Sequence, residues 1–178
     1  MKSPERETIV ALSSGALPSG VAVIRLSGPQ SVVICEAMAG TLPPPRMAAL
    51  RPIRDRNGLL LDRGIVLFFP GPNSFTGEDC LEFHLHGGRA VVESALNAAT
   101  EFENCRLAEA GEFSRRAFEN GKLDLVEAEG LADLLAAETE MQRLSRLYFE
   151  ITETDMAGAA VPQGCWDMVA FLDGYRNV

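Results

Sequence analysis

The sequence predicts an α+β fold, in which a mixed sheet domain is followed by a long C-terminal helix. Two observations predict it: β-branched strand patterns concentrate in the first half of the 178 residues, and helical spacing dominates after residue 89. Strands early and helices late are typical of α+β domains. A hydrophobic content of 47% and a charged content of 23% are those of an ordinary globular protein.

The first predicted elements are short and are separated by turn residues. Thr8–Leu12 and Val21–Leu26 are rich in β-branched residues, and the turn-rich SSGALPSG lies between them. A Gly-Pro pair ends the second strand, and Pro29 suits the first position of a helix that extends to about Met38. Three prolines at 43–45 exclude a helix across the linker that follows.

A hairpin and a further strand come next. The Asn57-Gly58 pair is a strong turn signal and joins Arg51–Asp55 to strands at 59–61 and 64–69. After a loop, alternating polar and apolar residues predict a strand over 80–86.

The second half is predicted to be helical. Two glycines lead into a helix over Arg89–Glu101, and a second helix covers Gly111–Asn120. Apolar residues then recur at helical spacing from Leu123 to about Phe149, which predicts one long helix.

Charge and composition limit the classes of function. A net charge of −9 argues against free-standing nucleic-acid binding, which needs lysine and arginine to displace counterions from phosphates. No segment approaches the ~20 apolar residues of a membrane span, and the N-terminus lacks the apolar run of a signal peptide. The four cysteines form no CxxC pair and indicate reduced thiols. We therefore expect a cytoplasmic protein.

The stretch PGPNSFTGEDCLEFHLHGG, residues 70–88, contains the first candidate site. On a strand, Glu82, His84 and His86 would share one face at intervals of about 6.6 Å. These groups could bind zinc, although no further ligand at a known spacing accompanies them. The glycines before the next helix could instead bind an anion through backbone amides. A solvated or intersubunit face is the third interpretation.

The charged stretch GEFSRRAFENGKLDL, 111–125, is either a surface helix pair or part of a site.

Several long motifs carry a family resemblance. The motifs PGPNSFTGED, HGG, AEAGEFSRRAF and NGKLDLVEAE occur in this order, after the start ETIVALSSGALPSGVAVIRLSGP. Together they closely resemble the N-terminal domain of the TrmE (MnmE) tRNA-modification GTPases. The resemblance covers roughly residues 6–140.

The resemblance implies a fold like that of folate-binding aminomethyltransferase domains and a constitutive homodimer. It also implies a bound tetrahydrofolate derivative, for which 5-formyl-tetrahydrofolate is an analogue. The folate-contacting positions carried over by motif are Arg25 in VIRLSG, Glu82 in EDCLEF and Lys122 in NGKLDL. No catalytic residue and no metal ligand is assigned.

The chemistry of these residues agrees with a folate pocket. A carboxylate such as Glu82 can accept two adjacent pterin N–H groups, and Arg25 and Lys122 can bind the carboxylates and formyl oxygen of folate. A charged Arg25 inside an apolar strand is costly unless it has a partner, which a binding site would supply. An internal salt bridge among these residues is the alternative. The polar strand face is then interpreted as a pocket wall rather than a metal site.

In full-length relatives this domain is followed by a helical domain, into which a GTPase domain is inserted. Together with a flavin-dependent partner protein, these relatives modify C5 of the wobble uridine of certain tRNAs. This sequence contains no GxxxxGK[ST] motif, no NKxD motif and no terminal CIGK, so it is expected not to hydrolyse GTP by the family mechanism. Cys165 does not match the terminal motif. Ala16 stands where relatives commonly carry an arginine.

Three segments are predicted. Residues 1–122 form a TrmE-like folate-binding and dimerisation domain, 123–151 the start of the truncated helical domain, and 152–178 an unassigned tail. The predicted function is a folate-binding, dimerising module of the tRNA-modification system that is not catalytic alone and makes little direct contact with nucleic acid. The alternative is a dimerising remnant, or truncated gene product, that no longer binds folate.

Overall fold

The computed structural model describes residues 6–124, 126–127 and 130 of the chain. The chain divides into two compact units, Met1–Lys122 and Leu123–Val178, and the fold described below is that of the first. In the second unit, Asp124 and Glu127 exchange backbone-to-carboxylate hydrogen bonds of 2.8 Å, the capping box of a helix N-terminus. The remainder of the predicted long helix and the tail from residue 152 lie outside the described residues.

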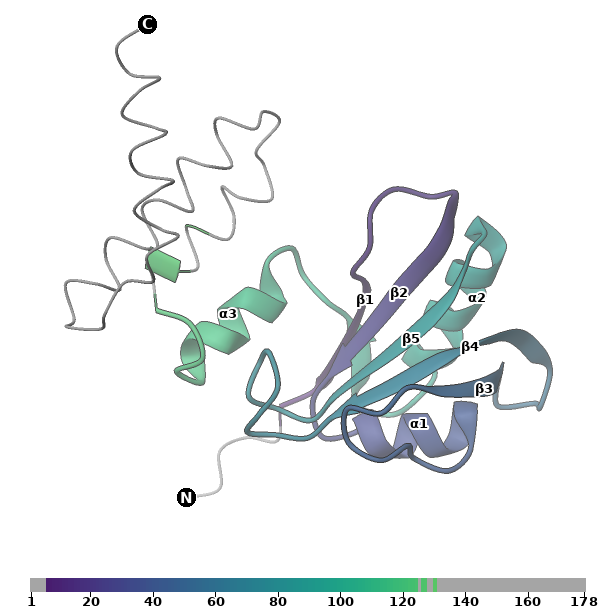
Figure 1. Cartoon of the computed structure of the whole chain (residues 1–178), viewed down its shortest axis with the longest axis horizontal. Helices are drawn as coiled ribbons and strands as arrows, with labels where there is room; N and C mark the ends of the chain where they lie inside the picture. Colours follow the sequence, from purple (N-terminus) through teal and green to yellow (C-terminus); the bar gives the residue numbers. More distant parts are fainter. Residues whose placement is uncertain (1–5, 125, 128–129, 131–178) are drawn as a thin grey trace, which may run out of the picture. The chain divides into compact units, whose positions relative to one another are not determined.

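Six strands and three helices make up the first unit (Figure 1). In chain order they are β1 (Thr8–Leu12), β2 (Ser19–Ser27), α1 (Ser31–Ala39), β3 (Ala49–Arg54), β4 (Leu60–Phe69), β5 (Cys80–Gly87), α2 (Arg89–Thr100), β6 (Cys105–Leu107) and α3 (Glu112–Glu119).

The strands form one mixed sheet in the order β3-β4-β5-β2-β1-β6. Every neighbouring pair is antiparallel except β1 and β6, which run parallel. Figure 1 shows α3 beyond one end of the sheet, apart from α1 and α2. The predicted α+β class with a mixed sheet is confirmed.

The core lies between one face of the sheet and two helices. Buried residues alternate along the central strands, as the period of two in a half-covered strand requires. The inward residues are Ala22, Ile24, Leu26, Val66, Phe68, Leu81, Phe83 and Leu85, and they join Ile34 and Met38 of α1 and Val92 and Ala95 of α2 in one cluster. Both helices therefore cover the same face. The opposite face of β2, β4 and β5 presents Val23, Arg25, Ile65, Glu82 and His84, and we call it the open sheet face.

Two elements differ from those predicted. β4 runs without interruption through Asp62 and Arg63, where the sequence predicted two short strands, because both residues pair with β3 across the sheet. β6 was not predicted. It is only three residues long and pairs in parallel with β1, so it leaves no periodic pattern in the sequence.

The described cysteines are buried free thiols. Cys35, Cys80 and Cys105 have no disulfide partner among the described residues. Burial raises the pKa of both Cys35 and Cys105 to about 11, so these thiols stay protonated at neutral pH. Within the same part of the chain, no helix has the length and apolar character needed to cross a membrane.

Candidate functional site

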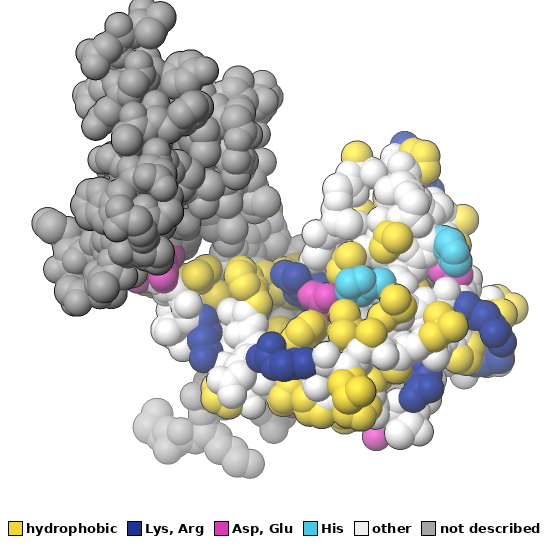
Figure 2. Space-filling model, viewed as in Figure 1, with side chains coloured by type: hydrophobic (Ala, Val, Ile, Leu, Met, Phe, Trp, Pro, Cys, Tyr) yellow, Lys and Arg dark blue, Asp and Glu magenta, His cyan; other side chains and the backbone are white. Residues whose placement is uncertain are grey.

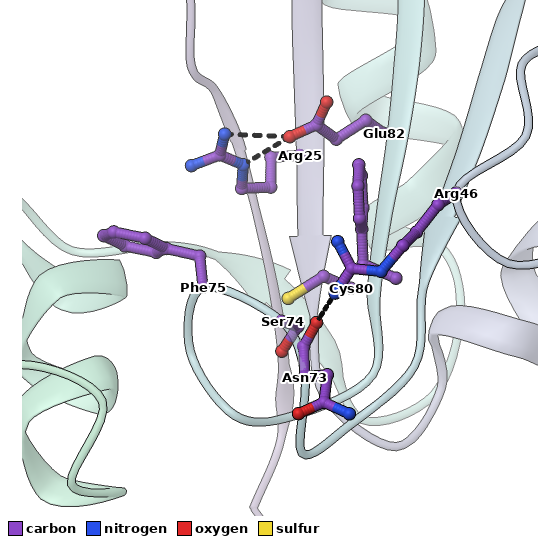
Figure 3. A pocket seen from close by; sticks show the side chains of 8 residues that line it. Arg25, Arg46, Asn73, Ser74, Phe75, Cys80 and Glu82 are labelled. Atoms are coloured by element: carbon purple, nitrogen blue, oxygen red, sulfur yellow. Dashed lines mark hydrogen bonds and ion pairs between the residues drawn. The ribbon is translucent and has the colours of Figure 1, made fainter.

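A pocket of about 350 Å³ opens where the loop after β4 meets the sheet (Figure 3). This volume is at the lower end of the ~300–1,000 Å³ typical of small-molecule sites. Its walls combine charged, polar and aromatic side chains from separate elements: Arg25, Arg46, Phe69, Asn73, Ser74, Phe75, Cys80 and Glu82.

Arg25 and Glu82 form an ion pair in this pocket. The antiparallel register of β2 and β5 places the two residues directly opposite each other on the open sheet face. Nε and Nη2 of Arg25 both donate to Oε1 of Glu82, at 2.9 and 2.8 Å. The Glu82 side chain is 13% exposed and that of Arg25 is 29% exposed. The pair explains how an apolar strand tolerates Arg25, and it leaves both groups within reach of a ligand.

His84 engages the other oxygen of the same carboxylate. Its Nε2 lies 2.9 Å from Oε2 of Glu82. A carboxylate has about four acceptor positions, so Arg25 occupies the two on Oε1 and His84 one of the two on Oε2. One position on Glu82 remains. A ligand with two adjacent donors must therefore displace His84 or one bond from Arg25.

His86 belongs to a different contact, although it lies on the same strand face. Its backbone N–H donates to Oδ2 of Asp62 at 2.8 Å, and its Nδ1 lies 2.9 Å from Oδ1. Burial opposes ionisation of Asp62, but the hydrogen bonds from His86 and from the backbone of Arg63 together outweigh it and lower the pKa of that carboxyl. The two histidines on this face of β5 therefore belong to separate contacts, His84 with Glu82 and His86 with Asp62. Among the described residues, no three His, Cys, Asp or Glu side chains are placed to share a metal ion.

Phe75 closes one side of the pocket. The Arg25 guanidinium carbon lies 5.6 Å from the centre of its ring, a cation–π distance. Thr76 anchors the loop that carries Phe75. Its hydroxyl lies 2.7 Å from that of Ser27, and its carbonyl accepts a 2.6 Å hydrogen bond from Nδ2 of Asn120. Phe75 therefore presents an aromatic face on an anchored loop.

Lys122 lies near this loop but is not among the residues that line the pocket. Its backbone N–H donates to the carbonyl of Ala117 at 2.8 Å and so ends the turn after α3. Its side chain lies next to Gly77, since a Cβ added to Gly77 would be 3.2 Å from Cε of Lys122. The structure thus brings together Arg25 and Glu82 of the three predicted positions, and Lys122 stands beside the loop that carries Phe75.

An ionic network ties α3 to the same loop. Nη1 of Arg116 donates to Oε2 of Glu78 at 3.0 Å, and Ser27 donates to the same oxygen at 2.6 Å. Nη2 of Arg116 donates to Oε1 of Glu112 at 3.0 Å. Within the charged stretch, Glu112 and Arg116 therefore have a structural role, since they hold α3 against the loop.

Sequence reasoning missed four pocket residues with recognisable roles: Arg46, Phe69, Asn73 and Phe75. Asn73 and Phe75 lie inside the motif PGPNSFTGED, which was the available signal for them. Arg46 follows three prolines in a segment without periodicity, and no pattern indicated that it reaches the pocket.

Comparison with known proteins places the chain in a family. The family model described as GTP-binding protein TrmE N-terminus matches residues 8–122. The tRNA modification GTPase MnmE of Brucella anthropi is 65% identical over 138 residues, which cover 78% of this chain and 31% of that protein. The proteins of the same name from Brucella canis and Rhizobium meliloti are each 65% identical over 137 residues. In both cases these residues cover 77% of this chain and 31% of the relative. The chain thus spans about a third of the length of these relatives. It belongs to the TrmE N-terminal domain family, as the sequence motifs predicted.

Proposed function

We propose that this chain is a tetrahydrofolate-binding, dimerising module of a system that modifies C5 of the tRNA wobble uridine. The observation that carries the proposal is the Arg25–Glu82 pair, which lines a pocket beside the aromatic ring of Phe75. Membership of the TrmE N-terminal family and the names of the relatives support the link to tRNA modification.

The residues present fit a reduced folate. Glu82 offers acceptors for adjacent N–H donors of a pterin ring, and Phe75 offers an aromatic face. The bonds that Glu82 already makes hold its carboxylate in one orientation, which lowers the entropy lost on binding. Binding would exchange the His84 bond for a ligand bond while Arg25 keeps its two bonds to Oε1 of Glu82.

The proposal assigns no GTP hydrolysis to these residues, because the sequence contains no GxxxxGK[ST] motif. In this proposal the module carries the one-carbon donor, while a GTPase domain and a flavin-dependent partner protein supply the other activities. Direct contact with tRNA is expected to be small, since the chain carries a net charge of −9.

The dimer is proposed to form through the open sheet face. Leu50 of β3 pairs with Ile65 of β4, and these side chains are 68% and 40% exposed. Figure 2 shows a basic, an acidic and a histidine side chain next to one another on a face that is otherwise rich in hydrophobic side chains. An apolar face of this kind is typical of interaction surfaces, and a second copy would cover it.

A calorimetric titration of 5-formyl-tetrahydrofolate tests the folate proposal. We expect saturable binding by the wild type and a loss of at least about tenfold in affinity for Glu82→Gln, because the variant loses charge-assisted hydrogen bonds. Glu93→Gln, an exposed carboxylate on α2, is the matched control and should bind normally. A folded wild type that does not bind would favour the dimerising remnant instead.

A further inference from the structure

We propose that Arg46 is the cation of the pocket that binds a carboxylate of the ligand. This inference rests on the proposed function, in which that carboxylate belongs to the glutamyl tail of the folate. It assigns the anionic end of the ligand to the segment before β3, which carries none of the positions implied by the family motifs.

The charged wall residues of the pocket do not balance one another. Its charged wall residues are Arg25, Arg46 and Glu82. Arg25 and Glu82 neutralise each other at 2.8 Å. Arg46 forms no ion pair with any carboxylate of the described residues; its polar contact is the neutral backbone carbonyl of Asn73. The pocket therefore carries one excess positive charge and attracts anionic ligands.

Arg46 is also held in place before any ligand binds. Its guanidinium carbon lies 5.6 Å from the centre of the Phe69 ring, and Nη2 donates to the Asn73 carbonyl on the loop that forms the pocket wall (Figure 3). The backbone N–H of Arg46 donates to the Phe68 carbonyl at 2.8 Å. Stacking and the hydrogen bond to Asn73 thus orient a long side chain that would otherwise lose considerable rotamer entropy on binding, and the backbone bond fixes the position of its Cα.

The backbone of Arg46 is strained as well. Its φ is +61°, a left-handed conformation that residues other than glycine, asparagine and aspartate rarely adopt. Such strain persists where the surrounding structure imposes it, and it clusters at ligand sites. Here the backbone N–H of Arg46 is bonded to the Phe68 carbonyl of the sheet.

Arg46 has donors left for a carboxylate. A guanidinium carries five N–H donors, and one of them is used by the Asn73 carbonyl. The remaining donors allow the two parallel bonds by which arginine binds a carboxylate. Lys122 does not line the pocket, and Arg25 is already paired. Arg46 is therefore the pocket cation best placed for the tail.

The test pairs a change in the ligand with a change in the protein. Calorimetry would compare 5-formyl-tetrahydrofolate with its diamide, in which both glutamyl carboxylates are neutral, for the wild type and for Arg46→Gln. We expect the wild type to bind the acid about tenfold more tightly than the diamide. Arg46→Gln should bind both ligands with the affinity that the wild type has for the diamide. Arg63→Gln, an exposed arginine of β4, is the control and should keep the tenfold preference.

Each other outcome overturns the inference in a distinguishable way. Equal binding of acid and diamide by the wild type would refute the role of Arg46 while leaving folate binding intact. An equal loss for both ligands in Arg46→Gln would show that Arg46 acts only through packing. Failure of the wild type to bind either ligand would overturn the folate proposal and this inference together. If Arg46→Gln does not fold, Arg46→Asn replaces it, because asparagine tolerates the left-handed conformation.

Discussion

Glu112 and Arg116 are the charged residues with the least exposed surface among residues 6–124, at 2% and 5%. Oε1 of Glu112 accepts bonds from Arg106 at 2.7 Å and from Arg116 at 3.0 Å. Oε2 accepts bonds from Arg106 at 2.8 Å and from the backbone of Glu109 at 2.9 Å. All four acceptor positions of the carboxylate are therefore used. The bonds from Arg106, opposed by burial, lower the pKa of Glu112 to about 2 from 4.5.

This pKa predicts how stability depends on pH. Because the folded pKa lies below the unfolded one, the stabilisation by Glu112 is complete above about pH 4.5 and is lost as pH falls towards 2. Glu112→Gln should lower the free energy of unfolding by about 3 kcal/mol at pH 7, since it removes the buried charge that both Arg106 and Arg116 bind and leaves Arg116 with Glu78 alone. Urea unfolding at pH 7 and pH 3 measures this, and the difference from the wild type should shrink at pH 3. An unchanged difference at pH 3 would contradict the assignment, and Glu93→Gln is the control.

At the scale of elements, β4 and β5 approach so closely at Gly64 that no side chain fits there. A Cβ built on Gly64 would lie 2.3 Å from the His84 carbonyl oxygen. Glycine at this position thus permits the pairing that aligns Ile65 with His84 and Leu67 with Glu82. The position of Glu82 in the pocket consequently depends on a residue of the neighbouring strand that does not touch the pocket.

Gly64→Ala should therefore destabilise the protein by about 3 kcal/mol or more, because the obstacle is backbone that cannot move without breaking the ladder. The thermal midpoint should fall by roughly 10 °C. Gly20→Ala in β2 is the matched control, since no heavy atom lies within 4 Å of its added Cβ. Circular dichroism melting curves compare the two variants, and similar midpoints would show that the sheet can relax around the added methyl group.

At the scale of the whole molecule, the buried cluster found among the described residues lies in the first unit. The buried cluster extends from Val10 to Cys105, and the first unit ends at Lys122. A fragment of residues 1–122 should accordingly unfold in one cooperative transition. Thermal melting followed by circular dichroism checks this, with the whole chain alongside. A fragment that melts gradually, without a transition, would show that the second unit is needed for folding.

The proposed dimer is tested by charging the open sheet face. Ile65→Lys places a charge at its centre and should shift the protein towards monomer, because an unpaired charge is costly in a buried interface. Multi-angle light scattering at micromolar concentration measures the mass. Leu59→Lys changes a residue that is 65% exposed and precedes β4, so it should leave the mass unchanged. A monomeric wild type would contradict the dimer itself.

The sequence by itself determined the α+β class, the family and most of the elements, because period-two and helical patterns are local and the family motifs are long. The sequence also predicted Arg25 and Glu82 as site residues, from the family motifs and from the unusual position of a charged Arg25 in an apolar strand. Lys122 was predicted on the same resemblance, and its contact with a ligand stays a prediction.

Only the tertiary structure decided which groups meet. Arg25 and Glu82 are 57 residues apart, and the register of β2 on β5 makes them a pair. That register also separates His84, which binds Glu82, from His86, which binds Asp62. Arg46 reaches the pocket through a left-handed backbone and stacking on Phe69, neither of which has a periodic signal. Local pattern specifies elements, whereas the site arises from contacts between elements, and those depend on register, loop geometry and packing.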